Sequence, residues 1–330
     1  MAQLLETKPV LSTDVPVFQP GKYNPSEIDT SSSPSPPPKP VLIYAPSEPG
    51  NYPVLLFFHG FLSSNRYYSD LLKFTSSHGF IVVAPQLYNL NPLNPMNLFH
   101  LGGCEELKFA VEVASWLKVG LRPPVLPGDV IANLEKVALA GHSRGGKTAF
   151  TIALGVGCRS PETPKCTQTF SALIGIDPVA GVKGPFGITN ITQPEILTHD
   201  FDMSIPVTVI GTGLGPESKV KGLFPACAPE GLNHKDFFNK CRPPCAHFVA
   251  EKYGHTDIFN DDSQLDIIGK ADCLACVNNK GPRGPMRRCV GGIVVAFLNY
   301  YFHDEKEDFM TIVNDPNVAP VKLDEVEFNI

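Results

Sequence analysis

Lys136-Val-Ala-Leu-Ala-Gly-His-Ser-Arg-Gly-Gly-Lys-Thr-Ala-Phe150 is the segment from which the architecture of this 330-residue chain follows. Its first five residues are typical of a strand, and the small residues after Ser143 are typical of a helix start. A chain that turns from a strand into a helix within one residue holds that residue in a strained conformation. A Cβ two positions to either side would collide with the turn, and Gly141 and Gly145 avoid these collisions. The segment therefore predicts a serine whose hydroxyl projects above a sheet.

A strand, the pattern Gly-x-Ser-x-Gly and a helix together indicate the nucleophile elbow of an α/β-hydrolase. The five-residue pattern is common by chance, so the interpretation depends on the rest of the chain. Strand-like and helix-like blocks alternate along it, which predicts a doubly wound, mostly parallel sheet with helices on both faces. The expected strands are 41–44, 54–58, 80–84, 137–140, 172–176, 205–210 and 246–249, and the expected helices are 67–77, 105–118 and 292–302.

Proline divides the chain into segments of different character. It accounts for 33 of the 330 residues, about twice the usual share of ~5%. Residues 31–40 (Ser-Ser-Ser-Pro-Ser-Pro-Pro-Pro-Lys-Pro) resemble a polyproline spacer with no capacity to pack. We therefore expect a flexible Pro/Ser-rich segment over 1–40, although short strands before the spacer could add to a sheet edge. A catalytic domain over 41–310 and a C-terminal tail over 311–330, packed on the domain, complete the expected organisation.

Charge argues against a nucleic-acid-binding protein, and hydropathy argues against a membrane-spanning one. The formal net charge is −6 and no basic cluster is longer than Arg287-Arg288, so we expect no nucleic-acid partner. No run of about 18 apolar residues is present, so we expect no membrane-spanning helix. The longest apolar candidate, residues 289–298, is too short to span a bilayer and fits a buried helix better.

Nine cysteines leave several forms of cysteine chemistry open. Cys241 and Cys245, together with Cys273, Cys276 and His247, could be interpreted as a zinc site. Only Cys273 and Cys276 have the tight C-x-x-C spacing of a zinc knuckle, so disulfides in loops or buried thiols are the more typical alternative. We therefore expect no metal site.

A serine hydroxyl needs a base to take its proton and a carboxylate to orient that base. In this fold the order along the chain is serine, acid, histidine, which removes every histidine up to His142. His255 lies in the Gly-containing loop after the expected strand 246–249, where this fold presents functional side chains. The remaining candidates are less well placed: His199 and His234 in polar loops, His247 within a strand, and His303 beyond the closing helix.

Asp177 is the favoured acid. It follows the expected strand 172–176 directly, and an ionised side chain after a run of apolar residues is costly unless it is paired. A strand-terminating Asp-Pro turn would explain the same pattern. Asp202, before the expected strand 205–210, and Glu217, after it, are the alternatives.

The oxyanion hole should combine the backbone N–H after the nucleophile with an N–H from an early strand loop. Arg144 supplies the first. The second is expected from Phe61, because strand 54–58 ends in His59-Gly60 and the glycine lets the backbone approach a substrate oxygen. We interpret the His59 side chain as structural. This chemistry needs neither a metal nor a cofactor, and we expect none.

Two long apolar loops bear on the substrate. Residues 87–103 combine Pro92 and Pro95 with several large apolar residues, and residues 211–245 hold Leu214, Leu223, Phe224, Phe237 and Phe238. If exposed, such loops would favour a bulky lipophilic ester or contact with a membrane. The alternative is that both loops pack onto the domain.

Several blocks of the sequence together resemble plant chlorophyllases. The resemblance runs from about residue 41 to the end, and its blocks are residues 77–88, 141–150, 173–181, 227–234, 246–255 and 285–298. It implies hydrolysis of the phytyl ester of chlorophyll, giving chlorophyllide and phytol. The catalytic residues of the family then map onto Ser143, Asp177 and His255, the three reached above from chain order and strand ends.

Other interpretations remain open from the residues alone. One is a general carboxylesterase or lipase of the same fold, and another is a non-catalytic pigment-binding module. The resemblance implies a chloroplast protein, but the N-terminus carries Glu6 and Asp14 and no Arg before Arg66, unlike a transit peptide. It also lacks the apolar core of a secretory signal peptide. Cytosol or another endomembrane therefore stays an alternative location.

Overall fold

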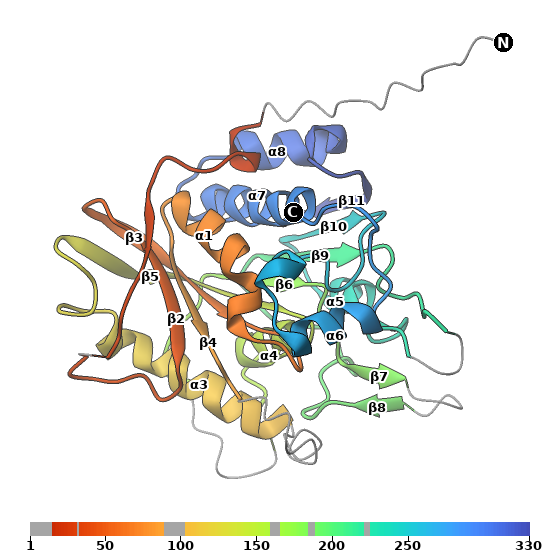
Figure 1. Cartoon of the computed structure of the whole chain (residues 1–330), viewed down its shortest axis with the longest axis horizontal. Helices are drawn as coiled ribbons and strands as arrows, with labels where there is room; N and C mark the ends of the chain where they lie inside the picture. The colour runs from red at the N-terminus through yellow and green to blue at the C-terminus, as the bar shows by residue number, and fades with distance from the viewer. Residues whose placement is uncertain (1–14, 32, 89–102, 159–165, 184–188, 221–224) are drawn as a thin grey trace.

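A nine-stranded sheet forms the centre of the described molecule (Figure 1). The computed structural model describes residues 15–31, 33–88, 103–158, 166–183, 189–220 and 225–330. The strand order is β1-β2-β4-β3-β5-β6-β9-β10-β11, with all pairs from β4 to β10 parallel and the edge pairs antiparallel. The bounds are β1 Pro25–Glu27, β2 Val41–Pro46, β3 Gly50–Phe58, β4 Ile81–Pro85, β5 Val130–His142, β6 Ala172–Ile176, β9 Val207–Thr212, β10 Cys245–Ala250 and β11 Leu323–Asn329. The expected doubly wound α/β-hydrolase sheet is confirmed.

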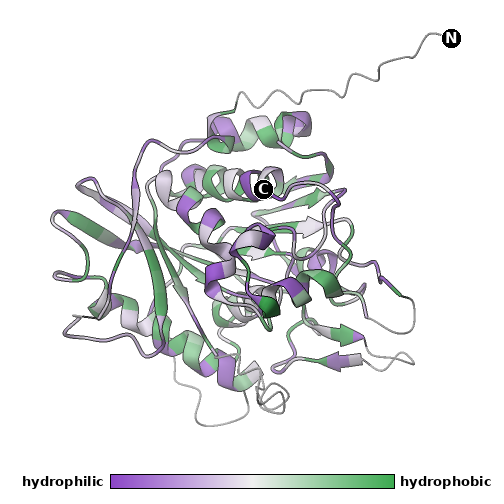
Figure 2. Cartoon of the chain, viewed as in Figure 1, coloured by the Kyte–Doolittle hydropathy of each residue, from purple (hydrophilic) through white to green (hydrophobic). Residues whose placement is uncertain are grey.

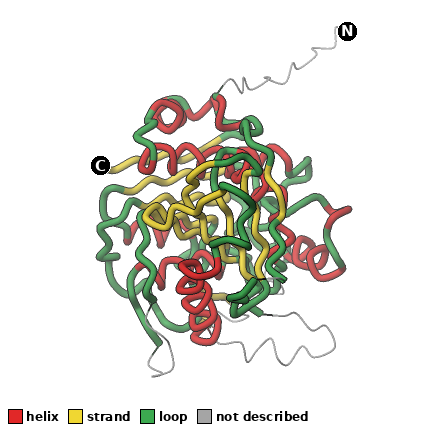
Figure 3. Tube along the Cα trace, turned by 90° about the vertical axis from the view of Figure 1, so that its left-hand side faces the viewer, coloured by secondary structure: helices red, strands yellow, loops and turns green. Residues whose placement is uncertain are grey.

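Helices cover both faces of this sheet (Figures 1 and 3). One face carries α1 (Ser69–Ser77), α7 (Gly284–Phe302) and α8 (Glu307–Asn314), and the other carries α3 (Gly103–Gly120), α4 (Arg144–Ala153) and α5 (His234–Lys240). Because side chains alternate along a strand, β3 feeds both cores: Leu55 and Phe57 pack with α7, while Leu56 and Phe58 pack with α4. The strands between the layers are accordingly mostly hydrophobic (Figure 2).

Smaller elements complete the described chain. A two-stranded sheet pairs β7 (Gly181–Lys183) with β8 (Thr189–Ile191), and α6 (Ile267–Ala275) lies between β10 and α7 in sequence. Short 3₁₀ helices are η1 (Pro16–Phe18), η2 (Asn65–Tyr68), η4 (Asp262–Gln264) and η5 (Pro316–Val318). Within the described ranges, no helix is both long enough and apolar enough to cross a membrane.

The packed structure starts earlier than residue 41. Phe18 of η1 is fully buried against α7, where a Cβ at Gly292 would collide with its ring. β1 extends the sheet edge by pairing with β2. Even the proline-rich spacer makes a specific contact, since Trp116 Nε1 donates a hydrogen bond to the Ser35 carbonyl over 2.8 Å. An extended segment that was expected not to pack thus still supplies a carbonyl acceptor to α3.

Parts of the expected apolar loops belong to the core. Phe237 and Phe238 lie in α5 and are buried, and Leu87 and Tyr88 are buried at the end of β4. These four side chains are therefore part of the packed interior, and Tyr88 donates a hydrogen bond to the Gly60 carbonyl over 2.8 Å. Residues 89–102, and Leu223 and Phe224 of the second loop, lie outside the described residues. At the C-terminus, β11 pairs with β10, so the tail is part of the sheet.

Candidate active site

The turn at Ser143 has the strained geometry expected of it. β5 ends at His142 and α4 begins at Arg144, so Ser143 alone makes the reversal, with φ 56° and ψ −126°. A Cβ at Gly141 would collide with the carbonyl of Gly145, and a Cβ at Gly145 would collide with the carbonyls at the end of β3. These close approaches are the physical reason for the two glycines.

Ser143, His255 and Asp177 form a continuous hydrogen-bonded series. The Ser143 hydroxyl donates to His255 Nε2 over 2.8 Å, and His255 Nδ1 donates to Asp177 Oδ2 over 2.7 Å. All three side chains are buried, and they follow the carboxyl ends of the parallel strands β5, β10 and β6. The structure thus brings together residues separated by 78 and 112 positions along the chain.

Asp177 sits in a polar cage at the end of β6. Its backbone has φ 40°, and its carboxylate accepts from Thr212 Oγ1 over 2.7 Å and from the Thr212 N–H over 3.2 Å. Burial acts to raise the pKa of Asp177, but hydrogen bonds from His255 and Thr212 and the nearby imidazoles outweigh it and lower the pKa. The carboxylate is therefore held in its charged form.

The two alternative acids are placed elsewhere. Asp202 forms an ion pair with Arg242 over 2.7 Å on the surface. Glu217 is exposed, and His255 is bonded to Asp177 instead. Thr212, which the sequence reasoning missed, could have been found by the same rule as Asp177, because it is the polar residue that ends the neighbouring strand β9.

The segment expected to supply an oxyanion donor lies next to Ser143. A Cβ at Gly60 would be 3.2 Å from the Ser143 Cβ, so the loop after β3 approaches the serine closely. The Gly60 N–H donates to the Tyr68 hydroxyl over 3.0 Å, which leaves Phe61 as the better candidate donor. Arg144 stands at the N-terminus of α4, where backbone N–H groups point out of the helix.

A buried network of side chains joins these parts. Tyr68 donates to His142 Nδ1 over 2.8 Å, and His142 Nε2 donates to the His255 carbonyl over 2.9 Å. Burial and the neighbouring His255 lower the pKa of His142 well below its usual value, so it stays neutral. Tyr68 and His142 thus link three parts of the site by hydrogen bonds: the loop at Gly60, the end of β5 before Ser143, and the His255 backbone. Chain order had removed His142 as a base, and its positioning contacts could not be read from the sequence.

Polar residues of α4 anchor the serine turn to α3 and β8. Arg144 Nε pairs with Glu106 Oε2 over 2.6 Å, and Thr148 Oγ1 donates to Glu106 Oε1 over 2.7 Å. Lys147 is buried and donates to the Thr192 carbonyl over 2.7 Å. Burial lowers the pKa of Lys147 to about 7. These contacts explain why the helix after the serine carries Arg, Lys and Thr in its first two turns.

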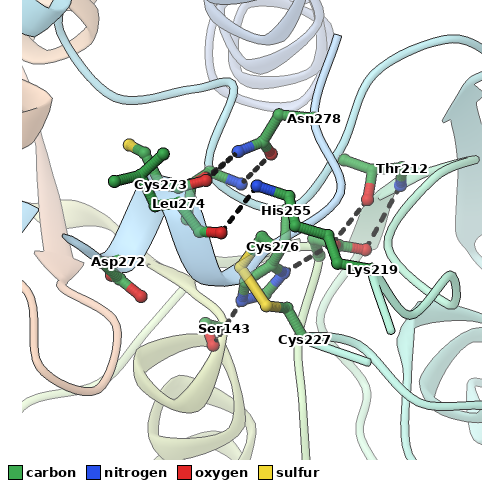
Figure 4. Close-up of a disulfide and its surroundings, with 12 residues drawn as sticks. Ser143, Thr212, Lys219, Cys227, His255, Asp272, Cys273, Leu274, Cys276 and Asn278 are labelled. Atoms are coloured by element: carbon green, nitrogen blue, oxygen red, sulfur yellow. Dashed lines mark hydrogen bonds and ion pairs between the residues drawn. A yellow bond between two sulfur atoms is a disulfide. The ribbon is translucent and has the colours of Figure 1, made fainter. Parts of the chain in front are cut away.

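The loop that carries His255 is held by the segment after α6 (Figure 4). Asn278 accepts from the Thr256 N–H over 3.3 Å and donates to Thr256 Oγ1 over 2.7 Å. The Asn279 N–H donates to Asp257 over 2.7 Å. A disulfide between Cys276 and Cys227 links this segment to the loop that follows β9.

The zinc interpretation has no support in the described residues. Cys276 is committed to the disulfide, and Cys241, Cys245 and Cys273 are free thiols. His247 bonds His234 over 2.9 Å. No group of three His, Cys, Asp or Glu side chains in the described part of the chain could hold a metal ion. A second disulfide joins Cys104 and Cys158.

His59 has a structural role. Its Nδ1 donates to the Gly60 carbonyl over 2.8 Å, and its Nε2 accepts from the Leu87 N–H over 3.0 Å. Burial lowers the pKa of His59 to about 4. The ring therefore ties the loop after β3 to the end of β4 as a neutral group.

A cavity of about 660 Å³ lies at the other end of the sheet. Its lining includes the end of α4 and the residues that precede β6 and β9, which places it at the amino ends of the parallel strands. Ser143 and His255 follow the carboxyl ends. In open α/β sheets ligands bind at the carboxyl ends, so we assign this cavity no part in the site.

A serine–histidine–aspartate series at the carboxyl ends of a doubly wound parallel sheet defines an α/β-hydrolase. A family model described as Chlorophyllase matches residues 13–330. Chlorophyllase-1, chloroplastic, of Citrus unshiu is 46% identical over 99% of this chain and 96% of its own length. Chlorophyllase-1 and chlorophyllase-2 of Arabidopsis thaliana are 45% and 42% identical, covering 95% and 94% of this chain and 88% and 96% of their own lengths. The chain belongs to the chlorophyllase family.

Proposed function

We propose that this protein is a serine esterase that hydrolyses the phytyl ester of chlorophyll to chlorophyllide and phytol. The observation that carries this proposal is the bonded series Ser143–His255–Asp177 in a chain of the chlorophyllase family. Each of the three side chains has the partner that its role in acyl transfer requires.

The reaction would proceed in two steps. His255, oriented by Asp177, takes the Ser143 proton as the hydroxyl attacks the ester carbonyl. The N–H groups of Phe61 and Arg144 stabilise the oxyanion, each by roughly 3 kcal/mol of barrier. Phytol leaves with the proton from His255. A water molecule, activated by the same imidazole, then releases the chlorophyllide carboxylate and restores Ser143.

Replacing Ser143 by alanine tests this mechanism. We expect Ser143→Ala to lower kcat for chlorophyll a by a factor on the order of 10⁴ or more, since the nucleophile is lost. Release of chlorophyllide from solubilised chlorophyll, followed by chromatography, is the measurement. Ser76→Ala is a matched control, because the Ser76 hydroxyl is buried in α1 and has no hydrogen-bond partner in the described part of the chain. Substantial turnover by Ser143→Ala would refute the mechanism.

The general carboxylesterase alternative is separated by substrate choice. The wild-type protein should prefer chlorophyll over p-nitrophenyl butyrate and over a triglyceride. A strong preference for the small ester would instead favour the general esterase. A fluorophosphonate probe should label Ser143, whereas failure to label would favour a non-catalytic binding module.

We also propose contact with a membrane surface. Ile267 and Leu274 are 86% and 72% exposed on α6. Val220 is also exposed, and it lies next to α6 because the preceding residue, Lys219, donates a hydrogen bond from Nζ to the Leu274 carbonyl. These three residues form the α6 patch. Exposed apolar groups beside a site suit a lipophilic substrate held in lipid. The net charge of −6 supports the expectation of no nucleic-acid partner.

We propose a chloroplast location. The relatives from Citrus unshiu and Citrus sinensis are named chloroplastic. The cytosol and other endomembranes are the alternatives, and imaging of a fluorescent fusion of the full chain would distinguish them.

A further inference from the structure

Asp272 is an acidic residue beside the proposed active site that the mechanism above does not use. It lies on α6, whose start is capped by Asp266 and whose end is held by the Cys227–Cys276 disulfide. Tyr67 also bonds Asp266. Because both ends of the short helix are anchored, the position of Asp272 is fixed. Figure 4 shows it on the same side of α6 as Ser143.

The surroundings of Asp272 leave its charge poorly compensated. Ser63, in the loop after Phe61, offers one hydroxyl proton to Asp272 Oδ2 and to the Phe61 carbonyl, each over 3.3 Å. No Lys, Arg or His of the described residues forms an ion pair with Asp272. Burial raises the pKa of Asp272 to about 6, against the opposing influence of His255 and Ser63. Asp272 is half-buried, so its carboxylate can be reached by a ligand, and a cation that approaches it would be attracted.

The chemistry of the proposed substrate supplies one such charge. The carbonyl groups on the edge of the chlorophyll ring are hydrogen-bond acceptors and repel a carboxylate. Its central magnesium is a hard cation that accepts an oxygen ligand above the ring plane. Only a two-carbon arm separates the ring from the phytyl ester carbonyl. With that carbonyl at Ser143, the ring lies within reach of the loop at Gly60 and Phe61, which approaches Ser143 closely and is joined to Asp272 through Ser63.

We propose that Asp272 is a specificity-determining residue that binds the central magnesium of the chlorophyll ring, directly or through its axial water, while the ester carbonyl lies at Ser143. This inference rests on the proposed function. It assigns a substrate contact to a residue outside the serine–histidine–aspartate series.

Asp272→Asn tests the proposal with two pigments that differ only in the metal. Chlorophyll a and pheophytin a carry the same phytyl ester, and pheophytin a lacks magnesium. At pH 8, where the Asp272 carboxyl is ionised, we expect the variant to lower kcat/KM for chlorophyll a roughly ten- to hundred-fold, the range for losing one contact to a charged group. For pheophytin a, kcat/KM should stay the same or rise.

Two controls separate recognition from folding. Glu217→Gln makes the same carboxylate-to-amide change at an exposed position and should leave both rates unchanged. The rate of fluorophosphonate labelling reports whether the Asp272→Asn site is intact, because this probe carries no metal. Equal losses on both pigments, or an unchanged preference, would overturn the proposal.

A binding measurement decides the question without turnover. In the Ser143→Ala background, chlorophyll a should bind more tightly than pheophytin a, and adding Asp272→Asn should abolish the difference. Equal binding of the two pigments before that change would also overturn the proposal. If the wild-type protein cleaved neither pigment, the proposed function would fail, and this comparison would still decide the role of Asp272.

Discussion

Single hydrogen bonds decide how well the proposed active site is oriented. Asp177 is fully buried yet keeps a lowered pKa, because His255 and Thr212 both donate to it. Thr212 contributes its hydroxyl and its N–H, so it fixes both carboxylate oxygens. The orientation of His255 depends in turn on that carboxylate. We therefore expect Thr212, which is buried against Asp177, to influence the rate through the orientation of His255.

Thr212→Val should lower kcat roughly ten-fold and stability by about 1 kcal/mol, since it removes one hydrogen bond to a buried carboxylate. The lowered pKa of Asp177 adds stability above its ordinary value of 3.8, and that stability is lost as the pH falls through the folded value. The variant raises this pKa, so its deficit should shrink between pH 7 and pH 3. Chlorophyllide release and urea denaturation at several pH values measure both effects.

Thr208→Val on the same strand is the matched control for Thr212→Val. The Thr208 side chain is buried in β9, and its hydroxyl has no hydrogen-bond partner among the described residues. We expect unchanged kcat and equal or greater stability. If both variants lost activity to the same degree, the effect would belong to the strand and the role given to Thr212 would be wrong.

Among the larger elements, the short helix α6 and the segment after it matter most for the site. Residues 277–279 bind the His255 loop, and the Cys227–Cys276 disulfide ties them to the loop after β9. The Cys104–Cys158 disulfide instead joins the start of α3 to the chain beyond α4. The two disulfides close loops of similar size, with sequence separations of 49 and 54 residues.

Removing each disulfide in turn should separate stability from catalysis. Both double serine variants should lose about 2–5 kcal/mol of stability, because loops of similar length restrict the unfolded chain similarly. Only Cys227→Ser/Cys276→Ser should also lower kcat, by roughly ten-fold or more, because it frees the segment that holds His255. Thermal unfolding and kcat at 25 °C are the measurements. A matching loss of kcat in Cys104→Ser/Cys158→Ser would count against this role.

At the scale of the whole molecule, the α6 patch and the proposed site share one end of the sheet. The carboxyl ends of the parallel strands carry Ser143 and His255, and Figure 4 shows both residues close to α6. Ile267 and Leu274 of α6 are exposed to solvent. A molecule that docks through this end would meet its lipophilic substrate without exposing the pigment to water.

Ile267→Ser/Leu274→Ser should weaken binding to phosphatidylcholine vesicles by a factor on the order of 10² to 10⁴, because each of the two large apolar side chains contributes about 1.5–3 kcal/mol. Activity on detergent-solubilised chlorophyll should not change. Ile131→Ser is the control, because Ile131 is 59% exposed near the start of β5, at the opposite end of the strands. Sedimentation with vesicles measures binding. Unchanged binding of the double variant would exclude the α6 patch as the contact.

Much of the architecture was predictable because local patterns carry it. Apolar strands alternating with amphipathic helices require a layered sheet, and the glycines around Ser143 are explained by the collisions that a Cβ would cause. The rule that functional residues follow parallel strands placed Asp177 and His255. Element limits were less accurate. β5 begins at Val130, where its first residues pair with β3, and α7 begins at Gly284, where Arg287 of its first turn donates to the Phe259 carbonyl.

The amino-acid sequence by itself pointed to the proposed chemistry through chain order and strand ends, since the proposed nucleophile, acid and base each occupy a position that is typical of the fold. Packing settled what holds them: the neutral His142 bridge, the Glu106–Arg144 pair and the disulfide beside His255. Phe18 and Asp272 also acquired their places only through folding, one against α7 and the other beside Ser63. Contacts between segments that are distant in sequence depend on how two folded surfaces pack together, and the local periodicity of either segment carries no information about that packing.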